Sequence, residues 1–129
     1  MKEQIMKRIK ILENNHVISH NVGNNTIKVL DEVIASLNDL DEEKISMFIT
    51  HFAMAAQRTE TGNIEQSMDK EVWETVKVDE SYSMAERFLQ QLLKDLNIKF
   101  PDSEKEFLLL HLCNVLHKEI GRASCRERV

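Results

Sequence analysis

Glycine, proline and cysteine are all scarce in this chain of 129 residues, which contains three glycines, one proline and two cysteines. A β-rich fold needs many tight turns, and such turns draw heavily on glycine and proline. Cys113 and Cys125 provide no disulfide framework, so we expect a reducing, cytoplasmic setting. These shortages disfavour both a sheet-based fold and a disulfide-stabilised secreted domain.

Long apolar runs and a basic face are also missing. Charges interrupt the first twelve residues, MKEQIMKRIKIL, so we expect neither a signal peptide nor a membrane-spanning segment. The formal net charge is −5, and within residues 1–119 basic residues outnumber acidic ones only in the first dozen residues. Because affinity for nucleic acids comes largely from cationic contacts, we expect no direct nucleic-acid binding and no membrane association.

What the sequence does contain is helical periodicity. Apolar residues recur every three or four positions, as in helices that bury one side. The expected inward-facing positions, helix by helix, are Ile5, Ile9 and Leu12; Val22, Thr26, Val29, Leu30, Val33, Ile34 and Leu37; Ile45, Phe48, Ile49, Phe52 and Ala56; Ile64, Met68, Val72 and Val76; Met84, Phe88, Leu92 and Leu96; and Phe107, Leu108, Leu110, His111, Val115 and Leu116. The pattern predicts an all-α fold, a compact bundle of about five helices behind a short lead-in helix.

Capping residues mark the expected ends of these helices. They are Asp39 or Asp41 before the central helix, Gly62 at its end, Ser83 with Glu86 as a capping box, and Asp102 or Ser103 after the helix-breaking Pro101. We divide the chain into a lead-in helix (residues 1–14), a helical domain (15–119) and a tail (120–129). The tail, IGRASCRERV, has no apolar stripe, and we interpret it as a non-native sequencing or cloning artefact.

Few residues offer chemistry. His16 and His20 have the i, i+4 spacing of two metal ligands, but no HExxH arrangement accompanies them and a surface loop is the favoured interpretation. His117 is expected to be exposed at a helix end, and Cys113 to be a small core residue. A metal-dependent enzyme using histidines is disfavoured, because no carboxylate has metal-binding spacing. We expect no metal, no cofactor and no enzymatic activity.

His51 and His111 differ from the other histidines because each lies in the middle of an apolar helix. On the helical period, His51, Ala55 and Arg58 share one face, as do Glu104, Leu108 and His111. A single such histidine is usually a satisfied residue at a helix interface. Two of them, each with a charged residue seven positions away, also fit a functional pair.

These two segments resemble the signatures of the phosphotransferase-system regulation domain (PRD) family. HFAMAAQRTETGN is similar to the first signature, with His51, Ala55, Arg58 and Gly62 at the matching positions. EKEFLLLHL is similar to the second, through Glu104, Phe107 and His111. The segment ERFLQQLLKDLNIKFPDSE also resembles the helix and turn that lead into that signature.

The resemblance implies a helical bundle that forms a homodimer and regulates bacterial sugar operons. It makes His51 and His111 the expected phosphorylation sites, with phosphoryl groups supplied by phosphotransferase-system carriers or sugar-specific components. Arg58 and Glu104 become the residues that shape the site. A domain of this kind would act through a partner protein, such as a separate transcription regulator.

An alternative keeps the fold and discards the phosphorylation. The family's first signature usually has an aspartate directly before its histidine, where this chain has Thr50. A single copy is also atypical, because most members carry two copies behind a nucleic-acid-binding module. Both departures fit a helical dimerisation or adaptor module with degenerate sites.

Overall fold

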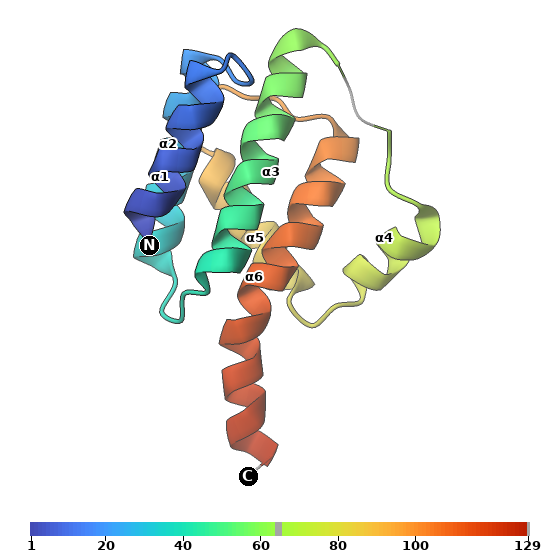
Figure 1. The fold of residues 1–129 in the computed structure, drawn as a ribbon. Helices are drawn as coiled ribbons and strands as arrows, with labels where there is room; N and C mark the ends of the chain where they lie inside the picture. The colour runs from blue at the N-terminus through green and yellow to red at the C-terminus, as the bar shows by residue number, and fades with distance from the viewer. Residues whose placement is uncertain (64–65, 129) are drawn as a thin grey trace.

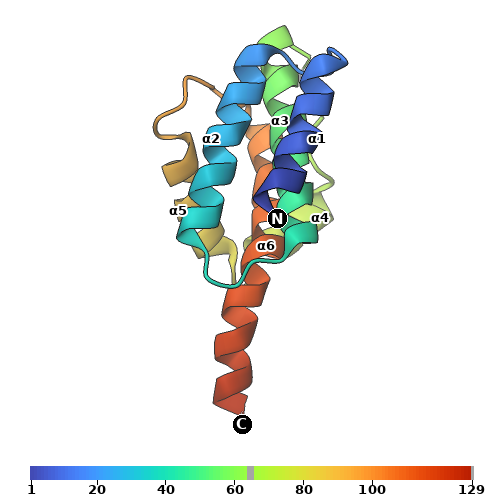
Figure 2. The same cartoon turned by 60° about the vertical axis from the view of Figure 1, so that its left-hand side comes forward.

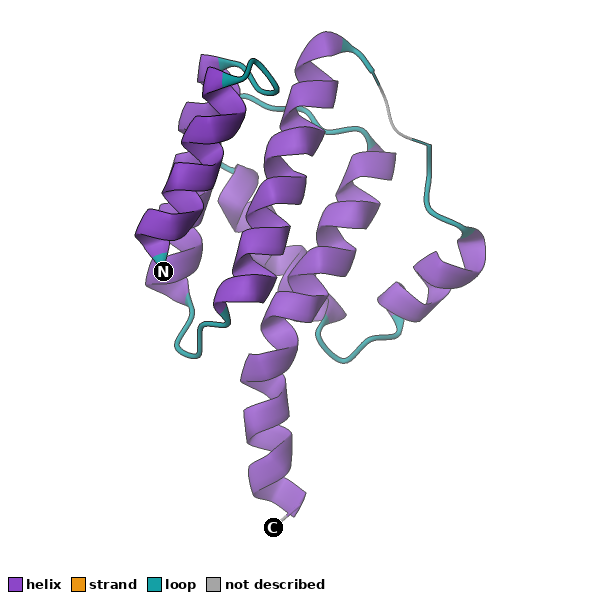
Figure 3. Ribbon diagram, viewed as in Figure 1, coloured by secondary structure: helices purple, strands orange, loops and turns teal. Residues whose placement is uncertain are grey.

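A computed structural model describes residues 1–63 and 66–128 of the chain, with side chains at 1–63 and 66–117. All regular secondary structure in this range is α-helical (Figure 3). The helices are α1 (Lys2–Asn14), α2 (His20–Ser36), α3 (Glu42–Thr61), α4 (Lys70–Lys77), α5 (Tyr82–Leu93) and α6 (Asp102–Arg128). The all-α prediction is confirmed. The number of helices in the described range is six, compared with the predicted five or so.

The additional helix is the lead-in segment, which is part of the bundle. Ile5 and Ile9 of α1 are buried, and α1 lies against both α2 and α3. Figure 1 shows α3 in the middle, with α1 and α2 on one side of it and α6 on the other. Figure 2 shows α4 and α5 on either side of α6. Helix α3 therefore has neighbours on both sides, which explains its many buried residues.

The predicted core positions are mostly correct. Phe48, Phe52, Leu30 and Ile45 are completely buried at the centre, together with much of the apolar stripe of each long helix. The correct positions follow from the 3.6-residue period, because one face of each helix packs on its neighbours. Burying these side chains is the main favourable contribution to folding.

The predicted fourth helix is wrong in its length and in part of its stripe. Helix α4 begins only at Lys70, because the Asp69 carboxylate accepts a hydrogen bond from the backbone N–H of Glu71 at 2.9 Å. Met68 therefore lies in the preceding loop, and Val72 is exposed. Ile64, the first predicted position of this stripe, lies outside the described residues.

The helix ends follow the predicted caps in the centre of the chain and depart from them at α5 and α6. Helix α6 begins at Asp102, so the predicted caps Asp102 and Ser103 both lie inside it. Asp41 caps α3 by accepting from the Lys44 N–H at 3.2 Å, and Gly62 ends it with a left-handed φ of 80°. The predicted capping box at α5 is wrong because the helix begins at Tyr82, after Ser81. Ser83 is thus already inside the helix.

The carboxylate expected to complete that box has a different partner. Glu86 accepts a hydrogen bond from the Tyr82 hydroxyl at 3.1 Å, one helical turn away. Met84, predicted to face inward from α5, is exposed. Phe88 and Leu92 are buried, as predicted, whereas Met84 lies on the same face but in the first turn of the helix, where it is exposed.

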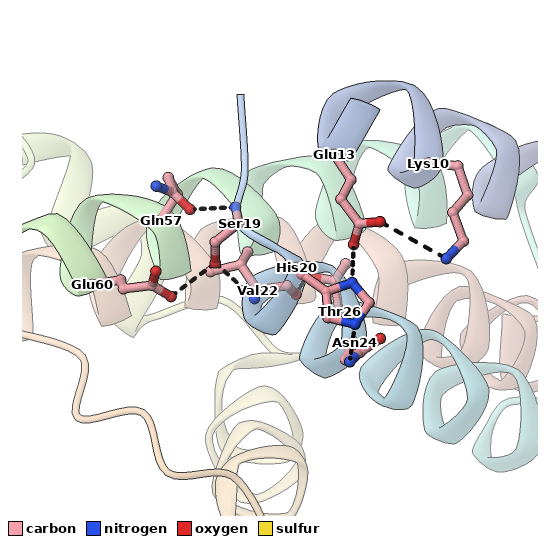
Figure 4. Close-up of polar contacts among 9 residues, drawn as sticks. All are labelled: Lys10, Glu13, Ser19, His20, Val22, Asn24, Thr26, Gln57 and Glu60. Atoms are coloured by element: carbon pink, nitrogen blue, oxygen red, sulfur yellow. Dashed lines mark hydrogen bonds and ion pairs between the residues drawn. The ribbon is translucent and has the colours of Figure 1, made fainter. Parts of the chain in front are cut away.

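The connection between α1 and α2 is held against α3 by polar contacts (Figure 4). The Ser19 hydroxyl caps α2 by accepting from the Val22 N–H at 3.1 Å and donates to Glu60 at 3.0 Å. The backbone N–H of Ser19 donates to the side chain of Gln57 at 2.8 Å. These contacts fix the position of α2 relative to the C-terminal half of α3.

The long last helix continues through Arg128 and extends past the other helices at the C-terminal end (Figure 1). The boundaries predicted at residues 14 and 119, and the artefactual origin of residues 120–129, stay predictions. None of the helices in the described part of the chain is long and apolar enough to cross a membrane.

Candidate functional site

The two signature segments lie side by side on α3 and α6, which run antiparallel. His51 of α3 faces His111 of α6. Arg58, seven residues after His51, faces Glu104, seven residues before His111. Equal spacing in opposite directions is what two antiparallel helices require for both pairs to form. The structure thus brings all four predicted site residues together on one interface.

The imidazole rings of His51 and His111 are stacked. Their centroids are 3.9 Å apart and their planes differ by 13°. His51 is exposed and His111 is half-buried, and no hydrogen bond joins either ring to another residue in the described part of the chain. The ring nitrogens are therefore not committed to structural contacts.

Arg58 and Glu104 form a bidentate ion pair. Nε and Nη2 of Arg58 donate to the two carboxylate oxygens of Glu104 at 2.7 and 2.9 Å. The Glu104 side chain is 0% exposed, whereas that of Arg58 is 29% exposed. The planar guanidinium matches both oxygens of the carboxylate, and such charge-assisted pairs are the stronger hydrogen bonds in proteins.

A small cavity separates the histidine from the ion pair. It has a volume of about 270 Å³ and is lined by His51, Ala55, Arg58, Glu104, Phe107 and Leu108. The space exists because position 55 carries only a methyl group, and Ala55 is buried. The cavity offers an imidazole at one end and a guanidinium at the other, with apolar walls between them.

Burial and neighbouring charge both keep the histidines neutral. Partial desolvation of the ring where it stacks on His111, and then the positive charge of Arg58, lower the pKa of His51 from its ordinary value of 6.5. Burial, and then His51, lower the pKa of His111 to about 4. Protonation of both stacked rings would place two positive charges in contact, so the pair is uncharged at neutral pH.

This pKa shift makes stability depend on pH. The unfolded chain takes up protons near pH 6.5, whereas folded His111 does so only near pH 4, so acidification between these values favours unfolding. Above pH 6.5 the contribution is constant. We expect His111→Gln to reduce the stability lost between pH 7 and 4.5 by about 1–2 kcal/mol, allowing for solvent screening of a half-buried ring.

Urea unfolding of both proteins at the two pH values measures this difference. His16→Gln is the matched control, because His16 is an exposed loop residue. An unchanged pH dependence in His111→Gln, equal to that of the control, would contradict the expectation.

The other histidines lie apart from this interface. His16 is an exposed loop residue with a φ of 60°, in agreement with the surface-loop interpretation. His20, assigned to the same loop, is instead the first residue of α2. Its Nδ1 contacts Glu13 and its Nε2 contacts Asn24, both at 3.3 Å (Figure 4). Among the described residues, no group of three or more histidine, cysteine or acidic side chains could hold a metal ion.

One polar pair was missed by the sequence reasoning. Nε2 of His117 lies 2.7 Å from Oδ2 of Asp79, in the turn between α4 and α5. No signal in the sequence indicates this contact, because the two residues are 38 positions apart and lie in different elements.

Cys113 is a buried core residue, as predicted. Its burial, and then the charge of Asp79, raise the pKa of its thiol to about 11.

The fold and the site together define an all-helical domain whose paired histidines meet between two antiparallel helices. A family model described as the PRD domain matches residues 27–115, which is more than half of the chain. The chain belongs to the PRD family. No curated protein and no solved structure matches it.

The matched region runs from α2 into α6 and includes His51, Arg58, Glu104 and His111. PRD domains are regulatory rather than catalytic, and they work with phosphotransferase-system components in the control of sugar-linked transcription. Family membership thus supports the class of function inferred from the two signature segments.

Proposed function

We propose that this chain is a regulatory domain of bacterial sugar-linked transcription control, modulated by phosphorylation of His51 and His111. The phosphoryl donors are carrier proteins or sugar-specific components of the phosphotransferase system, and the domain acts through a partner protein. The observation that carries the proposal is the meeting of two uncommitted imidazoles with a cavity that ends at Arg58.

The ring chemistry suits a phosphoryl acceptor. A neutral imidazole has a nitrogen lone pair that can attack phosphorus, and a protonated ring does not. The lowered pKa values of His51 and His111 keep both rings in the neutral form at pH 7. The exposure of His51 leaves one side of the pair open to a donor protein.

The surroundings suit a switch. A phosphoryl group on His51 would add a dianion beside a cavity that contains the guanidinium of Arg58 and the carboxylate of Glu104. The phosphoryl dianion attracts the guanidinium of Arg58 and repels the carboxylate of Glu104. It therefore competes with Glu104 for Arg58 and weakens the ion pair that joins α3 to α6. A charge change at this helix interface can therefore bias two arrangements of the bundle.

The proposal includes a cytoplasmic location and a homodimer, since two-fold symmetric dimers are the commonest oligomers of soluble proteins. It also keeps residues 15–119 as the regulatory domain, residues 1–14 as its lead-in helix and residues 120–129 as a non-native tail.

The test is phosphoryl transfer from purified carrier proteins to the full chain, with site-resolved mass spectrometry under alkaline conditions that preserve phosphohistidine. We expect phosphate at His51 or His111 in the wild type and its loss from the matching position in His51→Gln and His111→Gln. Arg58→Lys, which keeps the charge but not the planar fork, is the matched variant for the switch. Absence of phosphate from both histidines with every cognate carrier would exclude them as acceptors.

A second candidate, the adaptor module with degenerate sites, is favoured by one observation. Thr50 stands where the family usually has aspartate, and its hydroxyl donates to the Ser46 carbonyl oxygen of its own helix at 2.8 Å. No carboxylate at this position is available to orient His51. This candidate predicts normal partner binding and regulation in both histidine variants.

A further inference from the structure

The five histidines of the chain differ in how their ring nitrogens are used. Both nitrogens of His20 have polar partners, and neither nitrogen of His51 or His111 is hydrogen-bonded to a described residue. His16 is exposed in a loop. Only His117 combines one nitrogen held by a carboxylate with a second nitrogen that no described residue occupies.

The carboxylate that holds His117 is itself firmly placed. Oδ2 of Asp79 lies 2.7 Å from Nε2 of His117, and Oδ1 accepts from the backbone N–H of Ser81 at 2.7 Å. Burial alone raises the pKa of the Asp79 carboxyl, but the hydrogen bonds from Ser81 and His117 hold it below its ordinary value. Asp79 is therefore an anion at neutral pH, and it accepts a hydrogen bond from the Nε2–H group of the ring.

This arrangement determines the tautomer of His117. With the proton on Nε2, the lone pair is on Nδ1, and the carboxylate partner fixes both the tautomer and the orientation of the ring. The His117 side chain is 44% exposed. A histidine oriented by a carboxylate, with its other nitrogen available, is the usual arrangement for nucleophilic use of an imidazole.

We propose that His117 is a third phosphoryl acceptor of this protein, reacting through Nδ1, with Asp79 as its positioning residue. The inference rests on the proposed function in one respect only, the identity of the phosphoryl donor, which is a phosphohistidine of a carrier protein. It uses neither the stacked pair nor the cavity at Arg58.

The transfer balances without a further reactant. Nδ1 of His117 forms a bond to phosphorus as the nitrogen–phosphorus bond of the donor breaks. The donor ring, which carries a proton on its other nitrogen, takes the electron pair and leaves as a neutral imidazole. The His117 ring keeps its Nε2 proton and gains positive charge, which the anionic Asp79 offsets. The neighbouring Cys113 does not compete as a nucleophile, because it is buried and its thiol stays protonated.

The experiment has two arms on the full chain, one with carrier proteins and one with the small phosphoryl donor phosphoramidate. Site-resolved mass spectrometry and antibodies specific for each phosphohistidine isomer identify the modified nitrogen. In the variant His51→Gln/His111→Gln we expect phosphate on His117, as the Nδ1 isomer, in both arms. In the phosphoramidate arm His117 should react about tenfold faster than His16, and Asp79→Asn should remove that advantage.

His16 is the matched internal control, an exposed histidine in the same protein. Equal phosphoramidate rates at His117 and His16, or an unchanged rate in Asp79→Asn with unchanged helical content, would overturn the inference. Carrier-dependent phosphate on His51 or His111 but none on His117 would also overturn it and leave the proposed function in place. Carrier-dependent phosphate on His117 alone would support the inference while excluding the proposed pair.

Discussion

Replacement of Arg58 with alanine is expected to lower the free energy of unfolding by about 3 kcal/mol. Its partner Glu104 is 0% exposed and depends on the guanidinium for both of its carboxylate contacts at 2.7 and 2.9 Å. Removal of one member of a buried ion pair leaves an uncompensated charge in the interior, which typically costs about 3–5 kcal/mol. We place the value at the low end because Arg58 is partly exposed, so water can reach the vacated space.

Urea unfolding of Arg58→Ala, Glu104→Gln and the double variant measures this effect. Neutralising Glu104 in the Arg58→Ala background removes the stranded charge, so the double variant is expected to be more stable than Arg58→Ala alone. Such non-additivity is typical of residues in direct contact. A loss below about 1 kcal/mol in Arg58→Ala would mean that the pair behaves as an exposed surface salt bridge.

Replacement of Phe52 with alanine is expected to cost about 4 kcal/mol. Phe52 is completely buried next to His51 on α3, and its ring lies 6.4 Å from that of Phe48 and 5.5 Å from that of Phe100, centroid to centroid. Truncation of a buried phenylalanine to alanine typically costs about 3–5 kcal/mol, since it removes apolar contacts and leaves a cavity. Thermal and urea unfolding both measure this loss.

The matched control is Phe52→Leu, which keeps most of the volume and is expected to cost about 1–2 kcal/mol. The edge-to-face contact with Phe100 also anchors the segment that leads into α6 through Pro101. Phe52→Ala should therefore weaken the start of α6, where Glu104 lies, and accelerate amide exchange there relative to α2. Equal stability of the alanine and leucine variants would show that the site collapses around the missing ring.

Local sequence patterns were enough to predict α3, the central helix, which has neighbouring helices on both sides. The apolar stripe of α3 and its caps at Asp41 and Gly62 were predicted correctly, because a carboxylate before the first turn and a left-handed glycine after the last one act within a few residues. The predictions failed at α4 and at the start of α5. There, helices lie at the edge of the bundle, and contacts outside the apolar pattern set the boundaries: the Asp69 carboxylate caps α4, and the Asp79 carboxylate accepts from the Ser81 N–H just before α5.

The residues of the candidate site were predicted from the sequence, but the contacts between them were not. The sequence places His51 and Arg58 on one helical face and Glu104 and His111 on another, because helical periodicity is a local property. It does not contain the direction in which α3 and α6 meet, nor the register between them. The stacking of His51 on His111 and the complete burial of Glu104 follow from that register.

The sequence by itself thus determined the all-helical class, the inward faces of the long helices and membership of the PRD family through the two signature segments. Only the tertiary structure decided that the histidines share one stacked site, that Arg58 is engaged by Glu104, and that Asp79 orients His117. The physical reason is range. Helix propensity and capping act over a few residues, whereas these contacts join side chains 38 to 60 positions apart and exist only when whole helices have packed.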